Sequence, residues 1–227
     1  IIQAGPAVGA IIYAFNLDEG GNPTDKSGNI LDEENLNPKD SIGFGTSSED
    51  GKYSLNIEET FTKCGAIILI SSGGKGINEA TKINEEIASM KTIISNTCED
   101  NLKLIKGRAT ITPVTTIATS SCQELKQADF GWETGKPNCW KETGDMLGVE
   151  DIDIPPVNLN KEIKKVDSEE TIYSTVIAGI AMAAKDQGKN QFEYIQELVE
   201  EIKQRKFNEV DVDGQLIKVL NPSDKTK

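Results

Sequence analysis

The chain has 227 residues, and 24 Lys and Arg against 37 Asp and Glu give it a net charge of -13. This balance argues against nucleic acid and anionic membranes as partners, because binding to both begins from basic patches. Histidine is absent, which excludes imidazole metal ligands and the usual forms of Ser-His-Asp and Cys-His catalysis. The length corresponds to one or two domains, and no segment approaches the roughly 18 apolar residues of a membrane span.

The N-terminal part of the chain favours β-strands joined by polar turns. Residues 7–15 are apolar and β-prone, whereas residues 16–40 carry the Asp, Asn, Gly and Pro clusters of a long loop. Residues 42–46 predict a short second strand. The Asp-Gly pair at 50–51 predicts a tight hairpin leading into residues 52–57, where polar and apolar side chains alternate.

Further strands are expected before the helices begin. The continuous apolar residues 66–70 predict a buried strand. Residues 85–95 fit a helix or a strand, and their two-residue apolar period favours a strand. Residues 108–111 predict a short strand that leads to Thr112, which can cap a helix whose first turn accepts Pro113.

After Pro113 the apolar period becomes helical. A helix that Asp167 and Glu170 can cap is apolar on nearly every face, which predicts a central helix ending at Gly188. Another helix begins at Asn190, with an apolar stripe formed by Phe192, Ile195, Val199 and Ile202. Residues 210–220 predict a β-hairpin that turns at residues 213–214.

The four cysteines are Cys64, Cys98, Cys122 and Cys139, and none belongs to a Cys-x-x-Cys pair. An even number of scattered cysteines favours two disulfides over a zinc site. The short separation predicts a local bridge between Cys122 and Cys139, which leaves Cys64 to pair with Cys98. Because disulfides persist in oxidising compartments, we expect an exported protein, in a periplasm or outside the cell.

Two segments together resemble a known module. Residues 5–15, followed by residues 45–55 with an Asp-Gly-x-Tyr-x-Leu motif, resemble carboxypeptidase-regulatory-like domains. These are transthyretin-like β-sandwich modules of exported proteins. The placement of Tyr53 and Leu55 on one face of a strand agrees with that fold.

The resemblance implies an α+β chain with two parts. We expect a transthyretin-like β-sandwich domain over residues 1–112, followed by a helical domain with a C-terminal β-hairpin over residues 113–227. The segments 70–74, 78–81, 111–116 and 211–214 are also similar to a wider pattern of bacterial surface and lipoprotein-type proteins, which join such a β module to a helical one. This second resemblance implies a cell-surface or extracellular role and no known reaction.

Candidate ligand sites compete with plainer structural explanations. Residues 71–76 follow a strand but lack the spacing of a phosphate-binding loop, so a glycine turn is favoured. Acidic side chains of the long loop can offer oxygen ligands to calcium, the alternative being a solvated loop. Those of the last hairpin approximate the start of a calcium-binding loop, but Leu220 stands where such a loop needs a Glu, so a hairpin turn is favoured. The calcium candidates are Asp18, Asp25, Asp32, Asp211 and Asp213. No other cofactor or metal is expected.

Both tryptophans lie in or beside the stretch that Cys122 and Cys139 enclose. Phe130, Trp132 and the adjoining Trp140 form either a binding loop for a carbohydrate or a protein partner, or a small satellite core that holds the loop to the helices.

Three classes of function remain open. The chain can be a structural or adhesive surface protein, a carbohydrate- or calcium-binding accessory module, or a hydrolase that uses two carboxylates. None of the 37 acidic residues stands out as a catalytic group, so an enzyme is not expected. We favour the first class, with the accessory module as the alternative.

The expected mode of assembly is strand addition between copies of the chain, which can propagate into a filament. Short strands leave open sheet edges to which an apolar extended segment can pair. The candidate donors are Ile1, Ile2, Gln3 and Ala4 at the N-terminus, and Leu216, Ile217 and Val219 in the last hairpin. Two alternatives stay open: these segments pair within their own chain, or the partner is a carbohydrate or another surface protein.

Overall fold

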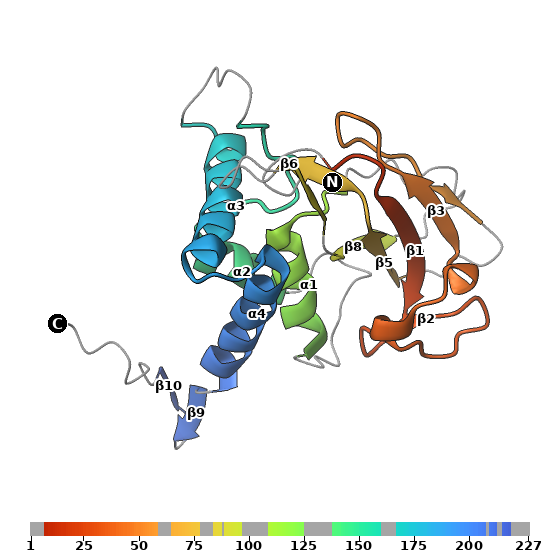
Figure 1. Cartoon of the computed structure of the whole chain (residues 1–227). Helices are drawn as coiled ribbons and strands as arrows, with labels where there is room; N and C mark the ends of the chain where they lie inside the picture. Colours follow the sequence, from red (N-terminus) through yellow and green to blue (C-terminus); the bar gives the residue numbers. More distant parts are fainter. Residues whose placement is uncertain are drawn as a thin grey trace.

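The structure is a computed structural model, and it describes residues 7–58, 65–77, 84–87, 89–96, 109–124, 138–159, 167–207, 209–212 and 215–218. Within these residues, four α-helices and antiparallel β-sheets form a mixed α and β fold (Figure 1). None of the helices in these ranges is both long enough and apolar enough to cross a membrane.

A six-stranded antiparallel sheet forms the larger β part. Its strands run in the order β4-β3-β1-β5-β8, and β2 pairs with the end of β1. They are β1 (Ile11–Leu17), β2 (Pro23–Thr24), β3 (Gly43–Thr46), β4 (Asn56–Ile57), β5 (Gly65–Ser72) and β8 (Met90–Asn96). Two-stranded sheets are formed by β6 (Lys75–Ile77) with β7 (Asn84–Glu86), and by β9 (Glu209–Val212) with β10 (Gln215–Lys218).

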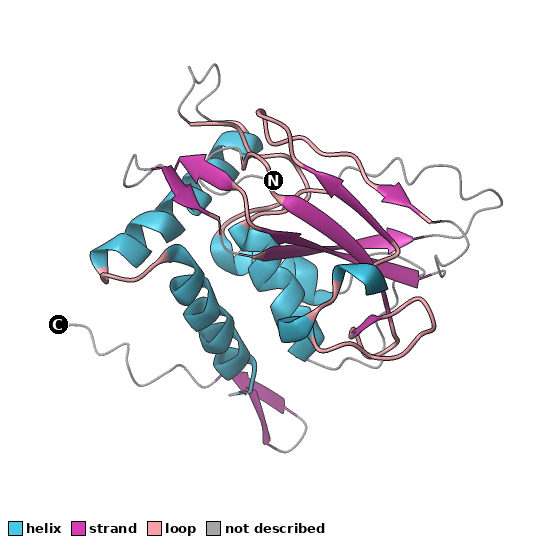
Figure 2. Ribbon diagram, turned by 45° about the vertical axis from the view of Figure 1, so that its right-hand side comes forward, coloured by secondary structure: helices cyan, strands magenta, loops and turns pink. Residues whose placement is uncertain are grey.

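The helices lie together on one side of the large sheet (Figure 2). They are α1 (Pro113–Glu124), α2 (Asn138–Leu147), α3 (Glu169–Asp186) and α4 (Gln191–Phe207). The sheet face that carries Phe15, Ile68 and Ile93 shares one hydrophobic cluster with helix residues such as Ile117 and Tyr173. Strands β1 to β8 thus precede α1 in the sequence and β9 and β10 follow α4, while a common hydrophobic cluster joins the large sheet to the helices in space. The predicted domain division at residue 112 stays a prediction.

The opposite face of the large sheet is also buried. Ile12, Ile67 and Leu69 point to this face, because alternate side chains of a strand point to opposite sides. They pack with Ile42 and with Ile111, which directly precedes α1. The structure thus shows an antiparallel sheet with helices on one face, and the transthyretin-like sandwich stays a prediction.

Most predicted strands are present. Residues 66–70 lie in β5, and residues 43–46 form β3. The tight turn at residues 50–51 is confirmed: Ser48 N–H donates to Lys52 O over 2.8 Å, and Gly51 has a φ of 76°, which favours glycine. Of residues 52–57, which are expected to follow this turn as a strand, only Asn56–Ile57 form one, β4. The preference for strand over helix in residues 85–95 is also confirmed, by β7 and β8.

The predicted strand over residues 108–111 is wrong for residues 109–111, which belong to no strand. This segment is held by side-chain hydrogen bonds and not by pairing with a neighbouring strand. Tyr53 Oη donates to Ala109 O over 2.7 Å, and Thr110 Oγ1 donates to Asp153 O over 3.0 Å. Burial raises the pKa of Tyr53, as expected for a phenol that serves as a structural donor.

Two expectations about α3 are corrected. Its N-cap is Ser168 and not Asp167, because the Ser168 side chain accepts the Thr171 N–H. It is also not the most enclosed helix, since Ile172 and Met182 are 46% and 55% exposed. By contrast, residues 111–119, which run from just before α1 into its second turn, are all buried. The predicted end of α3 is confirmed, with Gly188 directly after the C-cap.

We expect Gly45→Ala to lower the free energy of unfolding by about 1–3 kcal/mol, as other overpacking substitutions do. A Cβ atom at Gly45 would stand 2.1 Å from the Ser54 carbonyl oxygen, so the segment before β4 would have to move. Gly179→Ala is the matched control, because a Cβ atom there meets nothing within 4 Å and alanine favours a helix. Urea denaturation measures both variants; equal stability of the two would contradict the close approach.

Candidate functional site

The first turn of α1 is bound to the last strand of the large sheet through hydroxyl groups. Lys91 N–H donates to Thr116 Oγ1 over 3.0 Å, and Lys91 O accepts from Thr115 Oγ1 over 3.1 Å. Lys91 lies in β8, which stands at the end of the strand order, and these bonds satisfy backbone groups that β5 does not reach. At Lys91 this edge of the sheet is therefore closed to an added strand.

Thr112 connects α1 to α3. Thr112 Oγ1 and Tyr173 Oη lie 2.6 Å apart, and Tyr173 Oη donates to Ile152 O over 3.2 Å. Thr112 Oγ1 also accepts the Thr115 N–H over 3.1 Å, which confirms the predicted cap of α1. Burial raises the pKa of Tyr173. Hydrogen bonds of the segment 111–116 thus connect the large sheet, α1 and α3.

Three polar side chains from distant parts of the sequence meet beside α1. Lys91 Nζ lies 2.6 Å from Glu33 Oε2 and 2.8 Å from Gln123 Oε1. Gln123 Nε2 donates to Glu33 Oε1 over 2.6 Å and to Gly21 O over 2.9 Å. The side chains of Lys91 and Glu33 are 16% and 29% exposed, so much of the cluster is shielded from water. It combines a primary amine, a carboxylate and a carboxamide.

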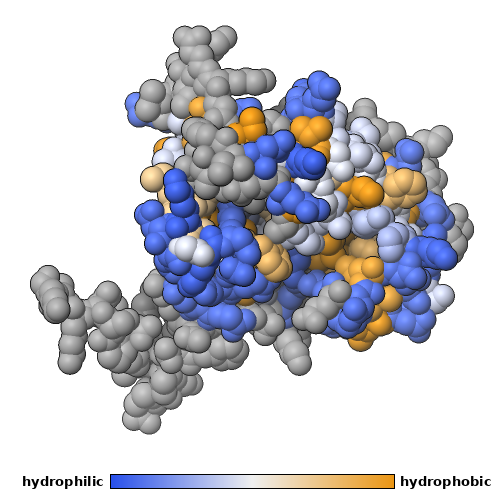
Figure 3. Space-filling model, viewed as in Figure 1, coloured by the Kyte–Doolittle hydropathy of each residue, from blue (hydrophilic) through white to orange (hydrophobic). Residues whose placement is uncertain are grey.

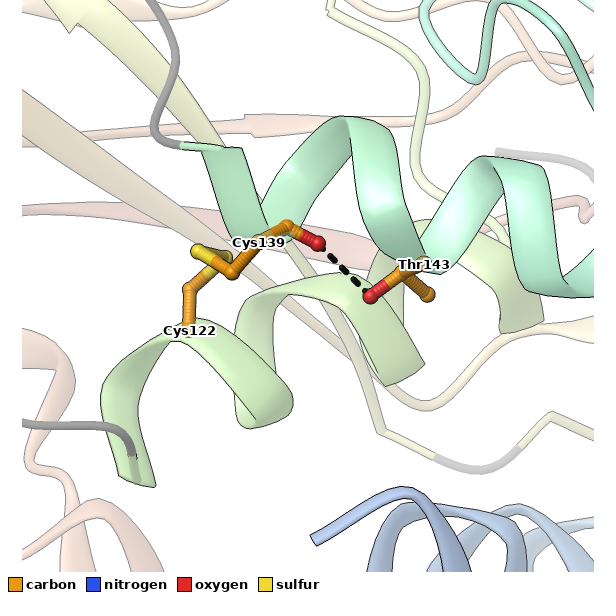
Figure 4. The surroundings of a disulfide bond; sticks show 3 residues. All are labelled: Cys122, Cys139 and Thr143. Atoms are coloured by element: carbon orange, nitrogen blue, oxygen red, sulfur yellow. Dashed lines mark hydrogen bonds between the residues drawn. A yellow bond between two sulfur atoms is a disulfide. The ribbon is translucent and has the colours of Figure 1, made fainter. Parts of the chain in front are cut away.

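The predicted disulfide between Cys122 and Cys139 is confirmed (Figure 4). It joins the end of α1 to the start of α2, the S–S distance is 2.09 Å, and both residues are fully buried. Thr143 Oγ1 donates to Cys139 O over 2.8 Å in the same turn of α2. The predicted pair of Cys64 and Cys98 lies outside the described residues.

Two of the candidate strand donors lie within the described residues. Leu216 and Ile217 lie in β10, where they pair with Asp211 and Val210 of β9. This confirms the predicted hairpin and shows that the two residues pair within their own chain. The segment 1–4 and Val219 lie outside the described residues.

The structure places Trp140 in the core. It lies on α2, is 4% exposed, and belongs to the hydrophobic cluster beneath the large sheet. Its side chain is therefore not at the tip of a binding loop, because the helices and the sheet enclose it. Phe130 and Trp132 lie outside the described residues.

The acidic side chains of the long loop close local turns. In each case a carboxylate accepts hydrogen bonds from an Asn three or four residues later; the pairs are Asp18 with Asn22, Asp25 with Asn29, and Asp32 with Asn35. The side-chain donor of Asn29 holds the pKa of Asp25 below its ordinary value. In the described part of the chain, no three acidic or cysteine side chains are grouped as a metal would require. The side chain of Asp211 and all of Asp213 lie outside that part.

The glycine-rich segment after β5 forms the expected turn. Strand β5 ends at Ser72 and β6 begins at Lys75, so Gly73 and Gly74 alone connect them. Both have positive φ values, 64° and 91°. A Cβ atom on Gly74 would stand 2.7 Å from the Ala10 backbone nitrogen, so the turn packs directly against the chain before β1.

Comparisons with protein-family models, with curated proteins and with solved structures find no match for this chain. Sequence reasoning missed the cluster of Glu33, Lys91 and Gln123, since these residues belong to no common motif and only folding brings them together.

Proposed function

We propose that this chain is a non-enzymatic, exported structural protein that assembles with copies of itself at a cell surface by strand addition. The observation that carries the proposal is the C-terminal hairpin. Within the described residues, β9 and β10 pair with each other and with no strand of the other sheets. A lone two-stranded hairpin is marginally stable in water, and a third strand stabilises it. A neighbouring copy supplies that strand through main-chain hydrogen bonds.

The acceptor in this proposal is the edge of the large sheet at β4. At the opposite edge, hydroxyl groups of α1 form hydrogen bonds with the backbone N–H and C=O of Lys91. Strand β4 stands at the end of the strand order, and Phe44 on the adjacent β3 is 63% exposed. Apolar side chains are visible over the strand-bearing half of the molecule (Figure 3). A hairpin that docks on β4 of the next copy makes a head-to-tail contact, which repeats into a filament.

The disulfide and the charge set the conditions for assembly. The Cys122–Cys139 bridge favours an oxidising compartment. A net charge of -13 makes identical chains repel one another, and salt screens that repulsion over about 10 Å at 0.1 M ionic strength. Assembly should therefore increase from low to moderate ionic strength.

Truncation after Phe207, which removes the hairpin, should leave a folded monomer, whereas the full chain should form filaments. Sedimentation velocity and electron microscopy measure the two proteins at matched concentrations. Met182→Lys is the control, because it removes an apolar side chain that is 55% exposed on α3 and should leave assembly intact. A full chain that stays monomeric at high concentration, or a truncated chain that still assembles, overturns the proposal and favours an accessory binding module.

A further inference from the structure

We propose that Lys91 and Gln123 join in an intramolecular isopeptide bond, with Glu33 transferring protons between them. The reacting groups are a primary amine and a carboxamide already in contact, with 2.8 Å between Lys91 Nζ and Gln123 Oε1. The product is a covalent link between β8 and α1, two elements that lie 32 residues apart at this contact. This modification is separate from self-assembly and does not depend on it.

The hydrogen bonds hold the carboxamide beside the lysine and fix which of its atoms faces the amine. Gln123 Nε2 donates to Glu33 Oε1 over 2.6 Å and to Gly21 O over 2.9 Å. Both amide protons are thereby used, so the amide oxygen faces the lysine. The two oxygens of one carboxylate then contact the attacking nitrogen and the departing nitrogen, since Lys91 Nζ lies 2.6 Å from Glu33 Oε2.

Both reacting side chains extend from backbone that is held in place. Hydroxyl groups of Thr115 and Thr116 fix the backbone of Lys91 against α1. Gln123 directly follows Cys122, whose disulfide fixes that end of the helix. Thr116 and Gln123 are about two helical turns apart, roughly 10 Å, so the lysine side chain runs along the helix to reach the amide. Such positioning reduces the entropy lost when two groups meet.

The reaction conserves atoms and charge. Glu33 accepts one proton from the Lys91 ammonium, and the lone pair of the resulting amine attacks Gln123 Cδ. A new C–N bond forms, and the bond from Cδ to the amide nitrogen breaks. Glu33 returns its proton to the departing nitrogen, which also takes the second proton lost by the lysine and leaves as ammonium. Glu33 is a carboxylate before and after the reaction, and the chain loses the positive charge of Lys91.

A second lysine–glutamine contact provides an internal comparison. Lys189 Nζ donates to Gln187 Oε1 over 2.8 Å and also pairs with Glu197. Its side chain is 32% exposed and that of Glu197 is 48% exposed, against 16% for Lys91 and 29% for Glu33. Water competes for the proton-transfer groups at such a site, so we expect no bond between Lys189 and Gln187.

Intact mass spectrometry of the reduced, denatured full chain tests the proposal. The mass should be lower than the mass of the sequence by one ammonia, and proteolysis should release a peptide that links Lys91 to Gln123. Lys91→Arg and Glu33→Gln should each have the full mass of their own sequences, whereas Lys189→Arg should keep the loss. The full mass in the unsubstituted chain overturns the proposal, as does a loss that persists in Lys91→Arg. The unsubstituted chain decides the question even if a variant does not fold.

Discussion

Replacing Trp140 by alanine should lower the free energy of unfolding by about 3–5 kcal/mol, as for other large aromatic side chains removed from a core. Trp140 is 4% exposed and packs in the cluster that joins the large sheet to the helices. Its loss leaves a cavity on α2 that the disulfide-linked helices cannot easily fill by moving. Guanidinium denaturation, followed by far-ultraviolet circular dichroism, measures the change.

Met146→Ala provides the control on the same helix. Met146 is 43% exposed, and a surface substitution of this kind usually changes stability by less than about 0.5 kcal/mol. If Trp140 instead belonged to a binding loop, its replacement would cost as little as that of Met146. Equal effects of the two substitutions would therefore contradict the placement of Trp140 in the core.

Removing the Cys122–Cys139 bridge should lower the free energy of unfolding by about 3 kcal/mol, because the bridge closes a short loop in the unfolded chain. The two residues are 17 positions apart and fully buried, so the double replacement Cys122→Ala and Cys139→Ala avoids burying a new polar group. Chemical denaturation of the two oxidised proteins measures the difference.

A reductant separates the covalent bond from the packing of the sulfur atoms. It should lower the stability of the unsubstituted chain toward that of the double variant, because the thiols keep their packing but lose the bond. If the reductant leaves the difference in free energy of unfolding between the two proteins unchanged, then packing, and not the bond, stabilises the contact between α1 and α2.

The local features were predictable from the sequence because short-range chemistry determines them. Asp50-Gly51 specifies a tight turn through the backbone freedom of glycine, and Pro113 after Thr112 specifies the start of a helix. The pairing of Cys122 with Cys139 follows from their short separation. In each case the determining residues are near neighbours in the chain.

Long-range placement was not predictable in the same way. Apolar composition favoured α3 as the central helix, yet α1 is more enclosed although it contains several threonines and serines. These side chains can be buried because they bond to nearby backbone, as Thr116 Oγ1 does to Thr112 O over 2.8 Å. The contact of Lys91 with Glu33 and Gln123 likewise depends on how the long loop and α1 meet β8, which no local pattern encodes.

Backbone hydrogen exchange in residues 209–218, measured on the full chain at increasing protein concentration, tests self-assembly through the hairpin most directly. The amides of β9 and β10 should exchange fast when the chain is dilute, because a lone hairpin opens readily. The same amides should exchange slowly once the chain assembles, because an added strand then holds them. Hairpin amides that exchange equally fast in the monomer and in the assembled state would contradict assembly through the hairpin.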